Sequence, residues 1–284
     1  MALLDRIDDV NRRLPHRRYY RLYANHQAIG WLDTQLLDEL DSALFTITTQ
    51  KQRVDIRFAP AQRQVFESRI EQFFRRYFAK HQLTGWRDEH YAVATGFGQN
   101  TLFLLERAAL SFLGIRGYGV HINGYVEGKD GIAMWIGKRA LNKPTFPGKL
   151  DQIAAGGLPY NLSLRENLIK ECHEEASIPR QLAEKAQAVS AISYYYDLPI
   201  GIRPDVIFNY DLRLPADFIP QVNDDEVDSF HLYPMDELLA MVANTQAFKF
   251  NSAVVIIDFA IRHGLITPEH PDYLALQAGM HQQW

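Results

Sequence analysis

Apolar positions recur with a helical period through much of the first 116 residues of the chain. This period predicts helices at 1–13, 33–44, 60–83 and 101–114. Strands are predicted in the same part at 52–58 and after Gly85, in the segment GWRDEHYAVAT. The pattern therefore indicates an N-terminal unit that contains both helices and strands.

The pattern changes near residue 116. Apolar residues then alternate with polar ones in short runs bounded by Gly, Asp and Pro, which predicts strands at 118–126, 132–140, 150–157, 188–197, 205–212 and 227–232. A helix at 163–176 interrupts these strands, and helices from Pro234 and at 251–263 follow them. We predict an α/β (α+β) protein with a smaller N-terminal α/β domain at 1–116 and a mixed-sheet α/β domain at 117–284.

Composition narrows the classes of partner. The chain has 284 residues, 47% of them hydrophobic, and a net charge of −4 without a dominant basic run, so no nucleic-acid partner is expected. No apolar run approaches the roughly 20 residues of a membrane span, so no membrane partner is expected either. Cys172 is the sole cysteine, which excludes an intramolecular disulfide and favours a reducing, cytoplasmic compartment.

The segment KECHEEASIP ends the predicted helix 163–176 and gathers three glutamates on one face: Glu171, Glu174 and Glu175, here called the glutamate triplet. Glu171 and Glu175 are like charges at i,i+4, and the C-terminal end of a helix disfavours anions. A bound divalent cation would remove both penalties, and carboxylate oxygens suit Mg²⁺ or Mn²⁺. The triplet therefore predicts a metal site, with an exposed acidic helix face as the alternative.

A glycine turn and a short loop, AAGGLPYNLS, lead into this helix. Here the chain resembles the Nudix hydrolase family, whose signature is G-x5-E-x7-R-E-U-x-E-E-x-G-U, with U aliphatic. Gly156 matches the first glycine, and the glutamate triplet matches the three later acids of the signature. The departures are Leu162 for the early glutamate, Lys170 for arginine and Ser177 for glycine.

The resemblance extends to further segments, which are similar to the Nudix subfamily related to thiamine pyrophosphokinase. These segments are GWRDEHYAV (85–93), ERAA (106–109), YGVHINGYV (118–126), MWIGKRALNKPTFPGKLDQIAAGG (134–157) and NDDEVDSFHL (223–232). It implies a Nudix α/β/α sandwich with a mixed sheet. It also implies Mg²⁺-dependent hydrolysis of thiamine diphosphate, or of its oxidised and damaged forms, to the monophosphate.

The resemblance assigns roles to particular residues. It implies metal ligands at the glutamate triplet and at the Gly156 carbonyl, and catalytic roles for Glu171, Glu175 and Glu226. The substrate diphosphate needs cations, and the candidates to bind it are Arg139, Lys149 and Arg203, with His121 as a further residue facing the cleft. The run Arg87, Asp88, Glu89 is expected to form either an ion-pair network or a wall of the substrate pocket.

Two other functions remain open at this point. One is a nucleoside-diphosphate-linked hydrolase of the ADP-ribose type, and the other is a non-catalytic Nudix-fold binding module, which the Leu162 and Ser177 departures leave open. The expected partner is a small-molecule diphosphate. A homodimer is a further expectation.

Overall fold

The computed structural model describes residues 2–129, 131–143 and 145–283 and has a mixed α/β fold. Its centre is a seven-stranded sheet whose main path runs β11-β12-β7-β8-β13, with β10 paired to β7 and β9 paired to β8. β12 lies parallel to β7, whereas the other neighbours are antiparallel. The strands are β7 (Gly117–Gly128), β8 (Gly131–Arg139), β9 (Leu150–Gln152), β10 (Ala154–Gly157), β11 (Gln187–Leu198), β12 (Gly201–Arg213) and β13 (Val227–Pro234).

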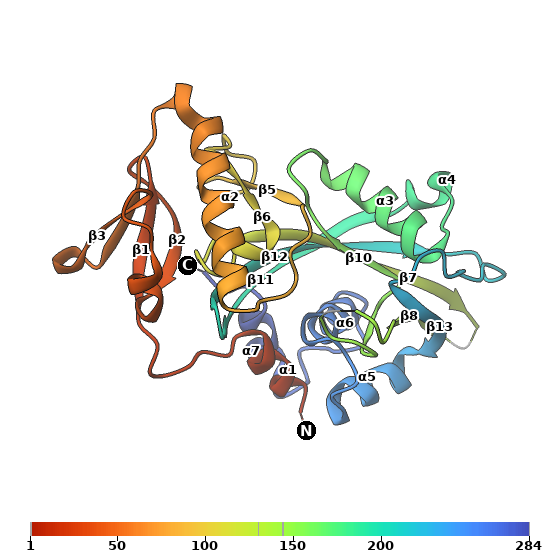
Figure 1. Cartoon of the computed structure of the whole chain (residues 1–284). Coiled ribbons are helices and arrows are strands. Elements are labelled where there is room, and N and C mark those ends of the chain that lie inside the picture. Colours follow the sequence, from red (N-terminus) through yellow and green to blue (C-terminus); the bar gives the residue numbers. More distant parts are fainter. Residues whose placement is uncertain (1, 130, 144, 284) are drawn as a thin grey trace.

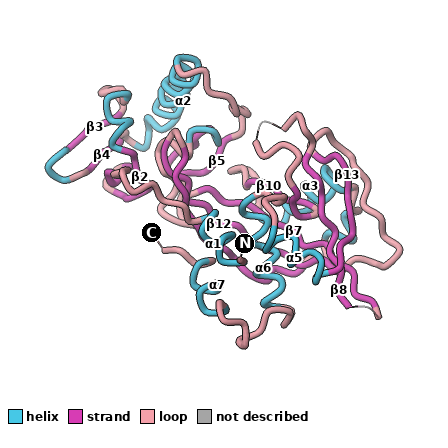
Figure 2. The backbone as a smooth tube through the Cα atoms, turned by 90° about the horizontal axis from the view of Figure 1, so that it is seen from below, coloured by secondary structure: helices cyan, strands magenta, loops and turns pink. Residues whose placement is uncertain are grey.

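Helices cover the two faces of this sheet (Figure 1). On one side lie α3 (Leu164–Ala176) and α4 (Arg180–Ala183), and on the other α5 (Met235–Asn244), α6 (Phe250–Arg262) and α7 (Tyr273–Gly279). Figure 2 shows the second group from below, in front of the sheet. Each side has its own apolar core, so the expected α/β/α sandwich is confirmed.

The remaining N-terminal elements form a separate group with a third apolar core, to one side of the sandwich (Figure 1). A four-stranded sheet with the order β2-β1-β4-β3 lies next to the long helix α2 (Arg63–Lys80) and the pair β5-β6. The strands are β1 (Tyr19–Ala24), β2 (Gln27–Asp33), β3 (Phe45–Thr48), β4 (Arg53–Ile56), β5 (His90–Val93) and β6 (Phe103–Glu106).

The first helix, α1 (Leu3–Val10), does not lie with the rest of the N-terminal part. It packs beside α6 and α7, and its Ile7 and Val10 belong to the same core as Ile256 and Leu276. A domain boundary near residue 116 remains a prediction. The segment before it contributes to the N-terminal core and, through α1, also to the core that contains α6 and α7.

Two helices expected from the sequence are wrong. Residues 33–44 contain only a 3₁₀ helix, Thr34–Glu39, begun by the Asp33 carboxylate, because their leucines pack onto the N-terminal core through a short turn. Residues 101–114 form β6 and a 3₁₀ turn, Arg107–Ala109, because Phe103–Glu106 pairs with β5. The helices expected at 1–13, 60–83 and 163–176 are confirmed as α1, α2 and α3. Among the described residues, no helix has both the length and the apolar character needed to cross a membrane.

Candidate active site

Local sequence fixes the start of α3, the helix that carries the glutamate triplet. The Ser163 hydroxyl accepts a hydrogen bond from the backbone N–H of Glu166 at 3.2 Å, and the Glu166 carboxylate accepts one from the Ser163 N–H at 2.8 Å. These two bonds satisfy N–H groups that have no partner inside the helix. Leu168 and Cys172 anchor the opposite face in the apolar core, which leaves Glu171 and Glu175 directed towards β10.

Gly156 on β10 lies directly against the Glu171 carboxylate. A Cβ atom added at Gly156 would overlap the carboxylate carbon and both of its oxygens. Residues with a side chain would therefore push Glu171 away from the strand. The glycine that the signature expects at this position therefore has a steric reason.

Lys170 is the cation that the triplet holds in this structure. Its Nζ lies 3.1 Å from Glu171 Oε1 and 2.7 Å from Glu174 Oε2. Glu175 is buried, and its Oε2 accepts a hydrogen bond from the Ala155 N–H at 2.8 Å. Within the described residues, no three His, Cys, Asp or Glu side chains are grouped closely enough to hold a metal ion. A metal bound here would replace the Lys170 ammonium between Glu171 and Glu174.

The electrostatics of the triplet favour an added cation. Burial raises the pKa of Glu171 in spite of the adjacent Lys170. Burial and the Glu171 charge raise the pKa of Glu175 well above its usual range. The raised pKa values mean that the negative charge on each carboxylate is poorly compensated where it is buried. The donor atoms are hard oxygens of the kind that Mg²⁺ and Mn²⁺ prefer. In chemical type, though not in the spacing of the described side chains, these carboxylates suit a hard divalent cation.

A cavity of about 530 Å³ adjoins these residues. It is lined by Gly156, Lys170, Glu171 and Glu174 from the triplet region, whereas Glu175 is not among the lining residues. A cavity of this size accommodates a small-molecule ligand. Four of the other residues singled out in the sequence also line it: His121, Arg139, Arg203 and Glu226.

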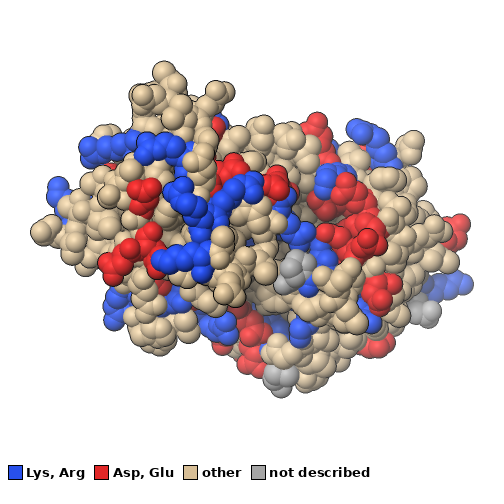
Figure 3. Space-filling view, viewed as in Figure 1, with Lys and Arg blue, Asp and Glu red and all other residues tan. Residues whose placement is uncertain are grey.

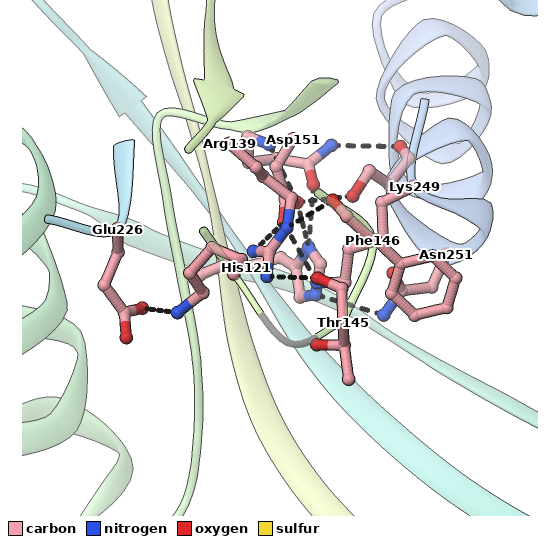
Figure 4. A network of polar contacts seen from close by, with 12 residues as sticks. His121, Arg139, Thr145, Phe146, Asp151, Glu226, Lys249 and Asn251 are labelled. Carbon is pink, nitrogen blue, oxygen red and sulfur yellow. Dashed lines mark hydrogen bonds and ion pairs between the residues drawn. The ribbon is translucent and has the colours of Figure 1, made fainter. Parts of the chain in front are cut away.

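Glu226 precedes β13 and forms an ion pair with Lys143, which also lines the cavity (Figure 4). Burial would raise the pKa of Glu226, but the Lys143 ammonium outweighs it and holds this pKa below its usual value. Glu226 therefore carries a negative charge at neutral pH. Its charge also acts on Glu171, so the two carboxylates lie within electrostatic range of each other.

Asp151 is the centre of a buried polar network that the sequence did not indicate (Figure 4). Its Oδ2 lies 3.3 Å from Arg139 Nη1 and 3.0 Å from Lys249 Nζ, and the Ser252 hydroxyl donates to its Oδ1. Burial raises the pKa of Asp151, yet Lys249 and the other cations hold it far below its usual range. Arg139 therefore has a structural partner as well as a place in the cavity wall.

His121 on β7 is buried beside this network. Its Nδ1 donates to Gln152 Oε1 at 2.7 Å, and its Nε2 accepts from Asn251 Nδ2 at 3.4 Å. Burial, and then the charge of Lys249, lowers the pKa of His121 to about 4. The ring is thus neutral at neutral pH, and it reaches the cavity as a hydrogen-bonding group without a charge.

Two further cations expected near the substrate differ in position. Arg203 lines the cavity, where its Nε lies 2.7 Å from Asp205 Oδ2. Lys149 is not among the lining residues, and its ammonium instead donates to the Gln246 carbonyl. The structure therefore does not place Lys149 with the other expected cations, and its role in binding substrate stays a prediction.

The N-terminal part also reaches the cavity, through Arg87, Glu89, Tyr91 and Arg107. Figure 3 shows blue and red side chains mixed across the middle of this face, between α2 and α3. The sequence left the run at 87–89 as either an ion-pair network or a pocket wall. In the structure Arg87 and Glu89 line the cavity, and Glu89 also forms an ion pair with Arg107.

These features define a Nudix-fold protein: a mixed sheet between two helical layers, with a glycine strand and a glutamate-bearing helix at the mouth of a cavity. Residues 2–117 match a family described as Domain of unknown function (DUF4743). "Nudix hydrolase 20, chloroplastic" of Arabidopsis thaliana is 49% identical over 194 residues, which are 68% of this chain and 52% of that protein. The chain thus spans about half the length of this plant relative.

An "Uncharacterized protein YJR142W" of Saccharomyces cerevisiae is 33% identical, and the match covers 100% of this chain and 90% of that one. The crystal structure of DR0079 from Deinococcus radiodurans matches with a TM-score of 0.43 at 19% identity, covering 60% of this chain and 98% of that one. Over 68% of its length the chain is thus similar to a plant protein named as a Nudix hydrolase, and over its whole length it is similar to the yeast protein.

Proposed function

We propose that the chain is a metal-dependent hydrolase that cleaves a diphosphate bond with water. The observation that carries this proposal is the position of Glu171 against Gly156, at a cavity of about 530 Å³ whose wall also carries basic side chains. Carboxylates that bind a cation and basic groups that bind phosphate are the two requirements of this chemistry.

Mg²⁺ or Mn²⁺ would be held by the glutamate triplet and the Gly156 carbonyl. A bound ion of this kind offsets negative charge on the diphosphate and lowers the pKa of a coordinated water. Lys170 lies between Glu171 and Glu174 and would then leave this position.

The chain's own residues supply the other functions. Glu226 is ionised at neutral pH and can accept a proton from the attacking water. Arg203 lines the cavity and offers a guanidinium to phosphate oxygens. His121 is neutral, so it can give up one of its present hydrogen bonds and form one to the substrate without adding charge to the site.

Thiamine diphosphate, or its oxidised and damaged derivatives, is our first candidate substrate, with the monophosphate as product. The sequence resemblance supports it, and the partly exposed Phe250 at the cavity, packed on Tyr194 and Tyr196, offers aromatic surface to a flat ring. The second candidate is an ADP-ribose type substrate, which belongs to the same class of diphosphates. The third reading is a binding module without turnover.

The other expectations stand as parts of this proposal. The partner is a small-molecule diphosphate, with neither nucleic acid nor membrane as a partner, and a homodimer is expected. A cytoplasmic location is expected from the single cysteine, although the matched plant relative is named chloroplastic.

Product analysis on a panel of diphosphates with Mg²⁺ tests the function. The wild-type chain should convert thiamine diphosphate to the monophosphate, and Glu175→Gln should lower kcat/KM about 100-fold or more. Glutamine keeps an acceptor for the Ala155 N–H, so the variant should stay folded. Glu184→Gln, at the exposed C-cap position that follows α4, is the matched control and should retain full activity.

Each remaining outcome has a defined meaning. Turnover of ADP-ribose without turnover of thiamine derivatives would support the second candidate. No turnover of any compound in the panel would contradict hydrolysis and leave the binding module.

A further inference from the structure

Arg87 is unusual among the basic residues of the cavity. Its exposed side chain lines the cavity, and its guanidinium has no hydrogen bond or ion pair among the described residues. The other basic residues that line the cavity each form an ion pair with a carboxylate: Arg107, Arg139, Lys143, Lys170, Arg203 and Lys249. An unpaired guanidinium has five N–H donors that can bind an anion at once.

The backbone at Arg87 is held firmly in spite of its position in a loop. Glu106 is 2% exposed, and its Oε1 accepts hydrogen bonds from the N–H groups of Arg87 at 3.1 Å and Ala108 at 3.2 Å. Its Oε2 accepts from the N–H of Glu89 at 3.1 Å. A buried carboxylate that accepts three backbone N–H groups fixes the two segments together.

The neighbours of Arg87 are already engaged. Asp88 accepts hydrogen bonds from Arg75 and Trp86, and Glu89 pairs with Arg107 at 2.9 Å. The loop therefore keeps its acidic residues occupied and leaves one cation open to the cavity. The Arg87 charge also helps to lower the pKa of Glu226, so the two side chains lie within electrostatic range of each other.

We propose that Arg87 binds an anionic oxygen of the diphosphate substrate and that Glu106 is the positioning residue that holds Arg87 in place. The inference rests on the proposed function and extends it, because it makes the N-terminal segment part of the substrate site. A bidentate bond from guanidinium to phosphate is the recognition it requires.

Steady-state kinetics with the diphosphate that the panel identifies test the role of Arg87. Arg87→Gln should raise KM about tenfold or more and change kcat less than about threefold, because the lost bond serves binding. Arg87→Lys keeps the charge without the planar fork and should recover part of the affinity. Arg76→Gln removes an exposed charge from α2, outside the cavity, and should behave as wild type.

Calorimetry with inorganic pyrophosphate and Mg²⁺ separates this inference from the proposed function. If the panel yields no turnover but Arg87→Gln weakens pyrophosphate binding about tenfold, the anion site stands and hydrolysis does not. If turnover is present and Arg87→Gln changes neither KM nor pyrophosphate affinity, the inference is overturned while hydrolysis stands. Absence of both turnover and pyrophosphate binding in the wild type would overturn the two together.

A double-mutant cycle tests Glu106. Glu106→Gln replaces one acceptor oxygen with a donor, so at least one of the three N–H bonds is lost, and KM should rise in the wild-type background. In the Arg87→Gln background the same change should leave KM unaltered, because the group that it positions is already absent. Equal effects of Glu106→Gln on KM in both backgrounds would show a purely structural role.

Discussion

Glycine and glutamate depend on each other where β10 meets α3. Gly156 leaves the space that the Glu171 carboxylate occupies, and burial there raises the pKa of that carboxylate. The spacing of the glutamates was readable in the sequence, because residues three and four apart share a helix face. That Lys170 would lie between two of them, and that Glu175 would bond to Ala155, required the folded chain.

Protonation of His121 makes the free energy of unfolding depend on pH. Its pKa is about 4 in the folded chain and near the ordinary 6.5 when unfolded, so protonation below pH 6.5 favours the unfolded state. The stabilisation is complete above pH 6.5 and declines as the pH falls towards 4, by up to about 3 kcal/mol. Chemical denaturation at several pH values measures this loss.

His121→Asn is the comparison, because asparagine can still donate to Gln152 and does not titrate in this range. The free energy of unfolding of the variant should change less between pH 6.5 and pH 4 than that of the wild type. Parallel pH profiles for the two chains would contradict a neutral buried His121.

Helix α3 shows how far local signals determine an element. The Ser163 and Glu166 capping pair and the leucine spacing are local, and both ends of the predicted helix 163–176 agree with the structure. Residues 101–114 show the opposite, because their apolar spacing also fits a strand followed by a turn. The pairing with β5 decided between the two, and this pairing, from His90 with Glu106 to Val93 with Phe103, lies outside the range of contacts within one helix.

The cap of α3 is testable on its own. Ser163→Ala removes the acceptor for the Glu166 N–H and should lower the free energy of unfolding by about 1 kcal/mol. Urea denaturation measures the change. Ser68→Ala, at an exposed position inside α2, is the control and should change stability by less than about 0.5 kcal/mol. Equal effects of the two substitutions would contradict the capping role.

The whole molecule is tied together by α1. Ile7 packs against Gly279 on α7 and belongs to the core that α6 forms under the sheet. The first ten residues therefore stabilise the C-terminal half, although a long N-terminal segment separates them from it in the sequence. A division of the chain near residue 116 would cut across this contact.

Ile7→Ala should lower the free energy of unfolding by about 2 to 4 kcal/mol, because it leaves a cavity in that core. Thermal or urea unfolding measures the loss, and Leu274→Ala serves as the control because Leu274 is 79% exposed on the same α7. A loss below about 0.5 kcal/mol for Ile7→Ala would show that α1 does not stabilise this core.

Helix α3, its cap and the face of the glutamate triplet followed from the order of residues alone, because each depends on neighbours within a few positions. The choice between the two readings of Arg87, the Asp151 network and the position of Lys149 did not, because they depend on segments that lie far apart along the chain. Burial and long-range pairing set which charges face the cavity and which are neutralised, and both exist only once the strands have been brought together.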